Sequence, residues 1–121
     1  MPRPQKKRRV CAMPHNTLFA PNCPASGSVI LRVDEYEVIR LIDWEGCTQE
    51  ECAAQMQVSR TTVQGIYERA RRQIADALVH GKSLTISGGD YTICEHCGKH
   101  CREGKPRCCH RKQCKQRNQE E

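Results

Sequence analysis

Residues 48–77 read TQEECAAQMQVSRTTVQGIYERARRQIADA and contain two helix starts with a tight turn between them. Thr48 and Glu51 have the spacing of a capping box, in which the Thr hydroxyl accepts one backbone N–H and the Glu carboxylate accepts another. A short helix is therefore expected from Gln49. Ser59 is suited to cap a second helix directly after the turn. The two caps and the short connection are typical of a helix-turn-helix.

The helix expected after Ser59 has one apolar and one polar stripe. Its apolar residues recur with a 3.6-residue period, which indicates a single buried face. They are Val63, Ile66, Tyr67, Ala70, Ile74, Ala77 and Leu78. In the shorter helix, Cys52, Ala53 and Met56 fall on one face, and the small Ala53 allows a second helix to cross closely.

The polar stripe of the longer helix has the residue types that read DNA. Such a helix enters the major groove with its first residues against base edges, while the preceding helix lies across the phosphate backbone. Arg pairs with guanine, Gln pairs with adenine, and Thr offers a hydroxyl and a methyl group. The residues predicted to contact DNA in this unit are Thr48, Gln49, Ser59, Arg60, Thr61, Thr62, Gln64, Arg69, Arg71 and Arg72. The alternative is an ordinary helical hairpin with a solvated basic face.

Charge is distributed unevenly along the 121 residues, whose net charge is +6. Residues 1–10 carry five basic and no acidic side chains, residues 11–93 carry seven basic and ten acidic, and residues 94–121 carry eight basic and four acidic. Basic ends around an acidic middle suit a polyanion held by arms and by one helix face. Arg8 and Arg9 are therefore further candidates for DNA contact, as in a homeodomain arm. Solvated, flexible tails are the alternative.

The rest of the chain is expected to be mainly α, with three helices. A basic arm and an irregular segment, pinned by Met13, Leu18 and Phe19, cover residues 1–28, and the helical domain covers residues 29–93. A β-prone run leads into a helix that Asp34 caps, with Glu37 at the capping-box position and Gly46 as its stop. Alternation around Gly88-Gly89 in residues 84–93 predicts a β-hairpin, either a DNA-contacting wing or a strand pair for dimerisation, and the lack of basic residues favours packing over phosphate contact. The longest helix should end near His80, with Gly81 as its cap.

The aromatic share of 4% is too low for a large core. A domain this small often needs oligomerisation or a metal to be stable, so a homodimer is expected. No run of eighteen apolar residues occurs, which favours a cytoplasmic protein without a membrane span.

Ordered blocks of residues resemble an uncharacterised prokaryotic family of small predicted DNA-binding proteins, the domain of unknown function one-three-four. The blocks are Arg8-Arg9-Val10-Cys11 with Pro14, Phe19 and Pro21, then Val33-Asp34-Glu35-Tyr36-Glu37, Ile39-Arg40-Leu41, Thr48-Gln49-Glu50-Glu51, Ser59-Arg60-Thr61-Thr62 and Gly88-Gly89-Asp90-Tyr91. The resemblance covers about residues 2–93. It implies a helix-turn-helix similar to region four of sigma factors, DNA binding, and a role in transcriptional regulation. Gln57 stands where such a turn usually has Gly, so it must accept a less comfortable backbone conformation.

The C-terminal tail, residues 94–121, has the composition of a metal site. Six of the ten cysteines lie between Cys94 and Cys114. Structural zinc commonly takes four ligands as two close pairs, and the preferred set here is Cys94, Cys97, Cys109 and Cys114, with Cys101, Cys108 and the histidines as alternatives. The surplus ligands leave an iron-sulfur cluster, or a zinc site with redox-responsive thiols, as alternatives. Cys11, His15 and Cys23 match no compact metal site.

The sequence patterns bear on three classes of function. A sequence-specific DNA-binding regulator is favoured. The second is a protein-interaction module that docks on RNA polymerase and uses a metal- or redox-responsive tail. An enzyme is not expected, since neither a Ser-His-Asp set, nor a phosphate loop, nor a carboxylate pair occurs in the sequence.

Overall fold

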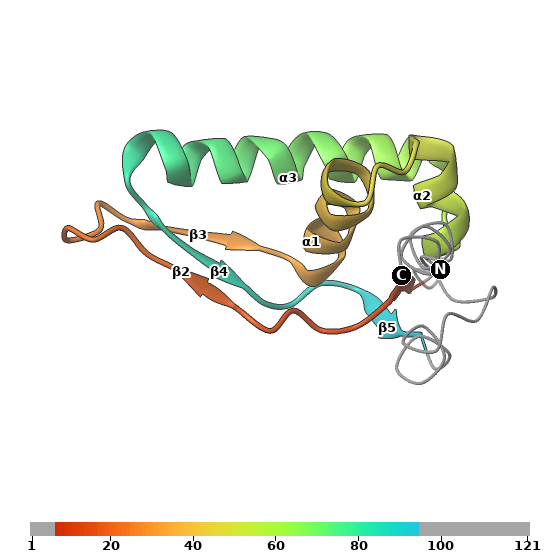
Figure 1. Cartoon of the computed structure of the whole chain (residues 1–121), viewed down its shortest axis with the longest axis horizontal. Coiled ribbons are helices and arrows are strands. Elements are labelled where there is room, and N and C mark those ends of the chain that lie inside the picture. The colour runs from red at the N-terminus through yellow and green to blue at the C-terminus, as the bar shows by residue number, and fades with distance from the viewer. Residues whose placement is uncertain (1–6, 95–121) are drawn as a thin grey trace, which may run out of the picture.

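The computed structural model describes residues 7–94, and this part of the chain folds into a mixed α/β domain (Figure 1). The three predicted helices are present. They are α1 (Val33–Ile39), which continues into the π-helical turn η1 (Arg40–Trp44), α2 (Gln49–Met56) and α3 (Arg60–His80). The strands are β1 (Arg8–Val10), β2 (Leu18–Phe19), β3 (Ser28–Leu31), β4 (Ser83–Ile86) and β5 (Tyr91–Ile93). The domain therefore contains more β-structure than the mainly α fold predicted from the sequence.

The predicted ends of α2 and α3 are confirmed. The backbone N–H of Glu51 donates to Thr48 Oγ1 at 3.0 Å, and the N–H of Thr48 donates to Glu51 Oε1 at 2.8 Å. The N–H of Thr62 donates to Ser59 Oγ at 3.1 Å. At the other end of α3, Gly81 adopts the left-handed conformation that ends many helices.

The start of α1 differs from the prediction. Its N-cap is Arg32, whose backbone N–H donates to Glu35 Oε1 at 2.8 Å. Glu35 therefore holds the capping-box position that was predicted for Glu37, and Asp34 is not the cap. Asp34 lies within the first turn and is buried, with only 2% of its surface exposed.

The predicted β-hairpin in residues 84–93 is wrong. Strand β4 lies between β2, to which it is antiparallel, and β3, to which it is parallel, whereas β5 pairs in parallel with β1. Gly88 and Gly89 have φ angles of +74° and +102° but do not reverse the chain. The N–H of Val33 donates to Gly88 O at 3.0 Å, so the segment between β4 and β5 is hydrogen-bonded to the start of α1. The chain then runs on to a second sheet, as Figure 1 shows.

The segment before β3 contributes to both sheets. Arg8–Val10 forms β1, so the assignment of these three residues to a basic arm outside the folded domain is wrong. Leu18–Phe19 forms β2 at the edge of the three-stranded sheet. Met13, Leu18 and Phe19 are 45%, 63% and 53% exposed, so they do not pin this segment as predicted. Its anchor is strand pairing, which the sequence pattern did not reveal.

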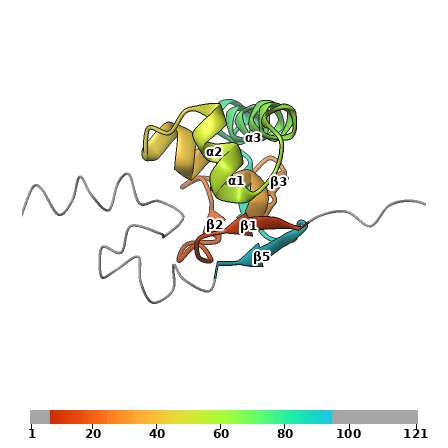
Figure 2. The same cartoon turned by 90° about the vertical axis from the view of Figure 1, so that its right-hand side faces the viewer.

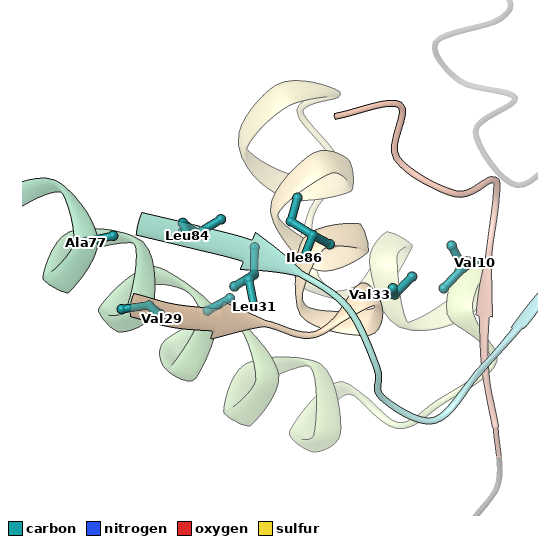
Figure 3. Packing of buried hydrophobic residues seen from close by; sticks show 8 residues of the cluster. Val10, Val29, Leu31, Val33, Ala77, Leu84 and Ile86 are labelled. Atoms are coloured by element: carbon teal, nitrogen blue, oxygen red, sulfur yellow. The ribbon is translucent and has the colours of Figure 1, made fainter. Parts of the chain in front are cut away.

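The helices lie above the strands (Figure 2), and the buried apolar residues form two clusters. One lies between β3, β4 and the C-terminal half of α3, where Leu31, Leu84, Ile86 and Ala77 gather (Figure 3). The other joins α1, α2 and the N-terminal half of α3, and its fully buried members are Val38, Leu41, Cys52, Met56 and Val63. The buried stripe of α3 is thus confirmed, except that Leu78 is 81% exposed.

Candidate functional site

The first turns of α3 present the polar residues singled out in the sequence. Arg60, Thr61 and Gln64 are all exposed, and the Arg60 side chain keeps 64% of its surface accessible. A Cβ built on Gly65 would meet only the Arg69 guanidinium at 3.8 Å among the described atoms, so the space outside this glycine is open. The face from Arg60 to Arg72 is therefore accessible to a large partner.

Three arginines of this face lie near carboxylates of the other helices. Arg60 Nη1 is 3.8 Å from Glu50 Oε1 of α2, and Arg71 Nε is 3.9 Å from Asp43 Oδ2 of η1. Arg69 Nε is 3.5 Å from Oε2 of the buried Glu35. The three arginine side chains remain 58–64% exposed. The pairs with Glu50 and Asp43 are exposed on both sides and contribute about 0–1 kcal/mol each, so a phosphate can compete for Arg60 and Arg71. 

Arg72 is also exposed, and no salt bridge joins it to any residue between 7 and 94. It therefore offers a guanidinium that no described carboxylate holds.

The position of this face is fixed by the crossing of α1 beneath α3. Glu35 in the first turn of α1 reaches Arg69, while Asp43 at its far end accepts a 2.6 Å hydrogen bond from Tyr67 Oη. Ala70 of α3 is fully buried, and its small side chain allows a neighbouring helix to approach closely. Arg71 stacks over the Tyr67 ring, 5.1 Å from its centroid. The hydrogen bond to Asp43 is the main reason that the Tyr67 pKa is raised.

Three predicted contact residues use their hydroxyls in hydrogen bonds of the helix caps. Thr48 and Ser59 accept the N–H groups of their own helices, as described above. Thr62 Oγ1 lies 2.8 Å from Ser59 Oγ in a second hydrogen bond. These hydroxyls are therefore shared with the caps, and Gln49 is half-buried. Arg60, Thr61 and Gln64 remain as the polar side chains most available at the start of α3.

The turn between α2 and α3 depends on Gln57. This residue has φ +60° and ψ +46°, the left-handed conformation, and it is the one non-glycine residue with positive φ among residues 7–94. The predicted uncomfortable backbone is confirmed. The N–H of Val58 then donates to Ala53 O at 3.0 Å, and this hydrogen bond stabilises the turn directly before Ser59, the N-cap of α3.

The structure places Arg8 and Arg9 against the protein, so their assignment as free arm residues is wrong. Arg8 Nε lies 3.8 Å from Asp34 Oδ2, Arg8 Nη1 lies 3.9 Å from Asp90 Oδ2, and the Arg8 side chain is 17% exposed. Arg9 Nε donates to the Gln55 carbonyl of α2 at 2.8 Å. Both arginines belong to β1, which pairs with β5, so their side chains contact the folded domain.

One exposed residue near this face was missed in the sequence. Trp44 ends η1, directly after Asp43, and is 79% exposed. In the sequence, the apolar residues of this helix cover more than half of its circumference, a pattern that favours burial. The π-helical turn changes the angular spacing of η1 and leaves the indole in solvent.

Of the proposed metal ligands, only Cys94 lies within the described residues, and it is buried. Cys97, Cys109 and Cys114, with the alternatives Cys101 and Cys108, lie outside them. Between residues 7 and 94, no three His, Cys, Asp or Glu side chains are placed to hold a metal ion. Cys11, His15 and Cys23 are thus not brought together there.

Residues 1–94 match the model of a family described as protein of unknown function DUF134. The chain belongs to this family. Members include the UPF0251 protein DSY3441 of Desulfitobacterium hafniense (strain Y51), 53% identical over 107 residues that cover 86% of each chain. A UPF0251 protein of Caldicellulosiruptor bescii is 47% identical over 121 residues, covering 93% of this chain and 86% of its own. 

In a third member, the UPF0251 protein NT01CX_1491 of Clostridium novyi (strain NT), the matched 105 residues are 48% identical and cover 84% of this chain and 70% of the relative. No solved structure matches the chain. Within residues 7–94, none of the helices is long and apolar enough to cross a membrane. The family match covers the described domain and ends at Cys94, where the Cys-rich tail begins.

Proposed function

We propose that this protein is a sequence-specific DNA-binding regulator of transcription, in which α2, the Gln57 turn and α3 act as a helix-turn-helix similar to region four of sigma factors. In this proposal the first turns of α3 enter the major groove, and α2 crosses the phosphate backbone. Arg60, Thr61 and Gln64 contact base edges, and Arg69, Arg71 and Arg72 contact phosphates. A regulator of this kind would act in the cytoplasm, at the nucleoid.

The observation that carries the proposal is the exposure of Arg60, Thr61 and Gln64 at the capped start of α3. The left-handed Gln57 directs the chain sharply from α2 into α3, so that the two helices pack on one core while this edge remains open. The open space outside Gly65 fits the close approach of a groove wall.

The carboxylate of Glu50 would oppose DNA binding by the neighbouring arginines. It is 77% exposed and lies 3.8 Å from Arg60. A phosphate approaching α2 would meet this carboxylate, and a base would have to draw Arg60 away from it. Glu50 would therefore lower the affinity for DNA of any sequence, because its carboxylate repels phosphates.

The Cys-rich tail and the oligomeric state complete the proposal. Zinc held by Cys94, Cys97, Cys109 and Cys114 would fold the tail on binding, because the tail has little apolar surface to bury; an iron-sulfur cluster is the alternative. A homodimer would present two α3 helices to half-sites about one helical turn apart, roughly 34–36 Å.

The test compares Arg60→Ala with Arg72→Ala on DNA selected from random sequence by the wild-type protein. Arg60→Ala should lose about 1–3 kcal/mol on the selected site and little on unrelated DNA. Arg72→Ala should weaken binding to both by similar factors and should lower the salt dependence by about one phosphate contact. Glu50→Gln should raise the affinity for both.

Two results would contradict the proposal. If the wild-type protein enriches no sequence, sequence-specific recognition is contradicted. If Arg60→Ala loses the same affinity for selected and unrelated DNA, the role of Arg60 in base contact is contradicted. Circular dichroism of each variant checks that the helices are intact, which is expected because both arginines are on the surface.

The second candidate is a protein-interaction module of the transcription machinery, and Trp44 favours it. Trp44 is 79% exposed and directly follows Asp43, which contacts Tyr67 and Arg71, and an exposed indole is typical of an interface anchor. Affinity purification after nuclease treatment, with RNA polymerase as the expected partner, separates the two functions. A partner retained without DNA and lost in Trp44→Ala would favour the interaction module.

A further inference from the structure

An apolar groove lies beside the C-terminal half of α3, at the end of the helix away from Arg60. It has a volume of about 480 Å³ and is formed by α1, α3, β3, β4 and the segment that includes β2. Its lining is apolar and includes Phe19, Pro21, Tyr36, Ile74, Leu78 and Leu84. Lys82 is the one charged side chain in this lining, and its Nζ donates to Asp76 Oδ2 at 3.1 Å.

Two large apolar side chains stand at this groove and are mostly exposed. Leu78 of α3 is 81% exposed and Phe19 of β2 is 53% exposed, although both line the groove. A ridge of apolar side chains beside an apolar groove on the same molecule is self-complementary. Such a face suits a two-fold symmetric contact, in which each copy inserts its ridge into the groove of the other.

The composition of the remaining chain argues against an occupant from the same molecule. Residues 95–121 contain no Leu, Ile, Val, Phe, Met, Trp or Tyr, and residues 1–6 contain Met1 as their single large apolar residue. Nucleic acid is also a poor occupant, since Lys82 is already neutralised by Asp76. A second copy of the domain supplies the large apolar side chains that the groove would accept.

We infer that this groove is the homodimer interface, with Leu78 of each copy seated in the groove of its partner. The inference names the surface for the homodimer in the proposed function, but it rests on the groove and not on DNA binding. It also explains why Leu78 follows the apolar period of α3 and yet lies in solvent.

The interface allows the spacing of recognition helices that the proposed function requires. Leu78 and Arg60 are eighteen residues apart on one helix, which corresponds to about 27 Å along its axis. Two α3 helices that meet at their C-terminal halves leave both Arg60 ends free. Their separation would be about 54 Å for collinear axes and about 34 Å, one turn of DNA, for axes that meet at roughly 80°.

The test measures the mass of the purified full-length protein in solution by analytical ultracentrifugation, at concentrations from 1 to about 100 μM without DNA. We expect a dimer for the wild-type protein and for Leu78→Met, which conserves the volume of the side chain. Leu78→Glu should shift the dimer dissociation constant by at least about 100-fold, because it places a charge in an apolar contact. Val79→Glu is the matched control, since Val79 is 73% exposed but does not line the groove.

A monomeric wild-type protein, or a Leu78→Glu variant that dimerises normally, would overturn the inference. Equal dissociation by Leu78→Glu and Val79→Glu would also overturn it, because the contact would then not be specific to the groove. DNA recognition is tested separately by the affinity of the monomer for a single half-site. The Leu78→Glu variant should retain this affinity, because Leu78 lies away from the residues proposed to contact DNA. If the wild-type protein forms a dimer that Leu78→Glu dissociates, but binds no DNA, the inference stands and only the proposed function is contradicted.

Discussion

Arg40 and Glu37 form a two-point ion pair in the interior, three residues apart on one helix. Arg40 Nε donates to Glu37 Oε1 at 2.9 Å and Arg40 Nη2 donates to Glu37 Oε2 at 2.8 Å, while Arg40 Nη1 donates to Glu45 Oε2 at 2.9 Å. Glu37 also accepts the backbone N–H of Cys11 at 2.9 Å. Burial by itself would lower the Arg40 pKa, but the Glu37 hydrogen bonds and the two carboxylate charges raise it above its ordinary value.

The first prediction concerns this pair. Arg40→Ala should lower the free energy of unfolding by about 3–5 kcal/mol, because it leaves Glu37, which has no exposed surface, as a buried charge without its cation. Urea denaturation followed by circular dichroism measures the change. Arg72→Ala, which removes an exposed arginine, should change stability by less than about 0.5 kcal/mol. A loss for Arg40→Ala as small as that of the control would contradict a structural role for the pair.

A second prediction concerns the left-handed residue in the α2–α3 turn. Gln57→Gly should stabilise the protein by about 0.5–1 kcal/mol, since glycine adopts φ +60° without the steric cost that a Cβ brings. The increased entropy of the unfolded chain offsets part of this gain. Thermal unfolding compares the variant with the wild type. A lower melting temperature would show that the Gln57 side chain makes a stabilising contact that outweighs its backbone strain.

A third prediction separates the two neighbouring glycines that follow β4. A Cβ on Gly89, at φ +102°, would lie 2.6 Å from Oδ1 of the buried Asp34, whereas one on Gly88, at φ +74°, would have no described atom within 4 Å. Gly89→Ala should therefore cost about 2–4 kcal/mol, and Gly88→Ala about 1–2 kcal/mol from backbone strain alone. The two urea denaturation midpoints decide between them. Equal losses would mean that the contact with Asp34 has no energetic weight.

The parts of the fold that are set by local interactions could be predicted from the sequence. Thr48, Ser59 and Gly81 act through hydrogen bonds and dihedral angles within their own turns, so each marked a helix end correctly. Gln57 was identified in the same way, by its position at the corner. The exposed residues of α3 followed from periodicity, because the buried stripe of a helix fixes its opposite stripe as well.

The parts that depend on pairing between distant segments could not be predicted. The strand alternation in residues 83–93 was real, but Leu84 pairs with Phe19 and Val29, and Tyr91 pairs with Arg8. A period of two residues shows that a segment is a strand and does not show its partner. The same limitation explains Arg8 and Arg9. A basic run looks like a free arm until Asp34, Asp90 and the Gln55 carbonyl are placed beside it.

The last prediction concerns the alkaline stability of the domain. Burial is the main reason that the pKa of the Cys52 thiol, ordinarily 9.0, is raised to about 12. In the unfolded chain this thiol ionises near its ordinary value, so above pH 9 the unfolded state binds fewer protons than the folded state. Stability should therefore fall as the pH rises from 9 towards 12, by up to about 1.4 kcal/mol per pH unit from this group.

Cys52→Ala isolates this contribution. The variant loses the contact of Cys52 Sγ with Met56 Sδ at 3.8 Å, so it should be less stable at pH 8, but its stability should fall less steeply between pH 9 and pH 10. Tyr36 and Tyr67, whose pKa values are also raised, act in the same direction at higher pH in both proteins. Urea denaturation at pH 8, 9 and 10 with a phosphine reductant measures the two slopes. Identical slopes would show that Cys52 ionises as readily in the folded protein as in the unfolded chain.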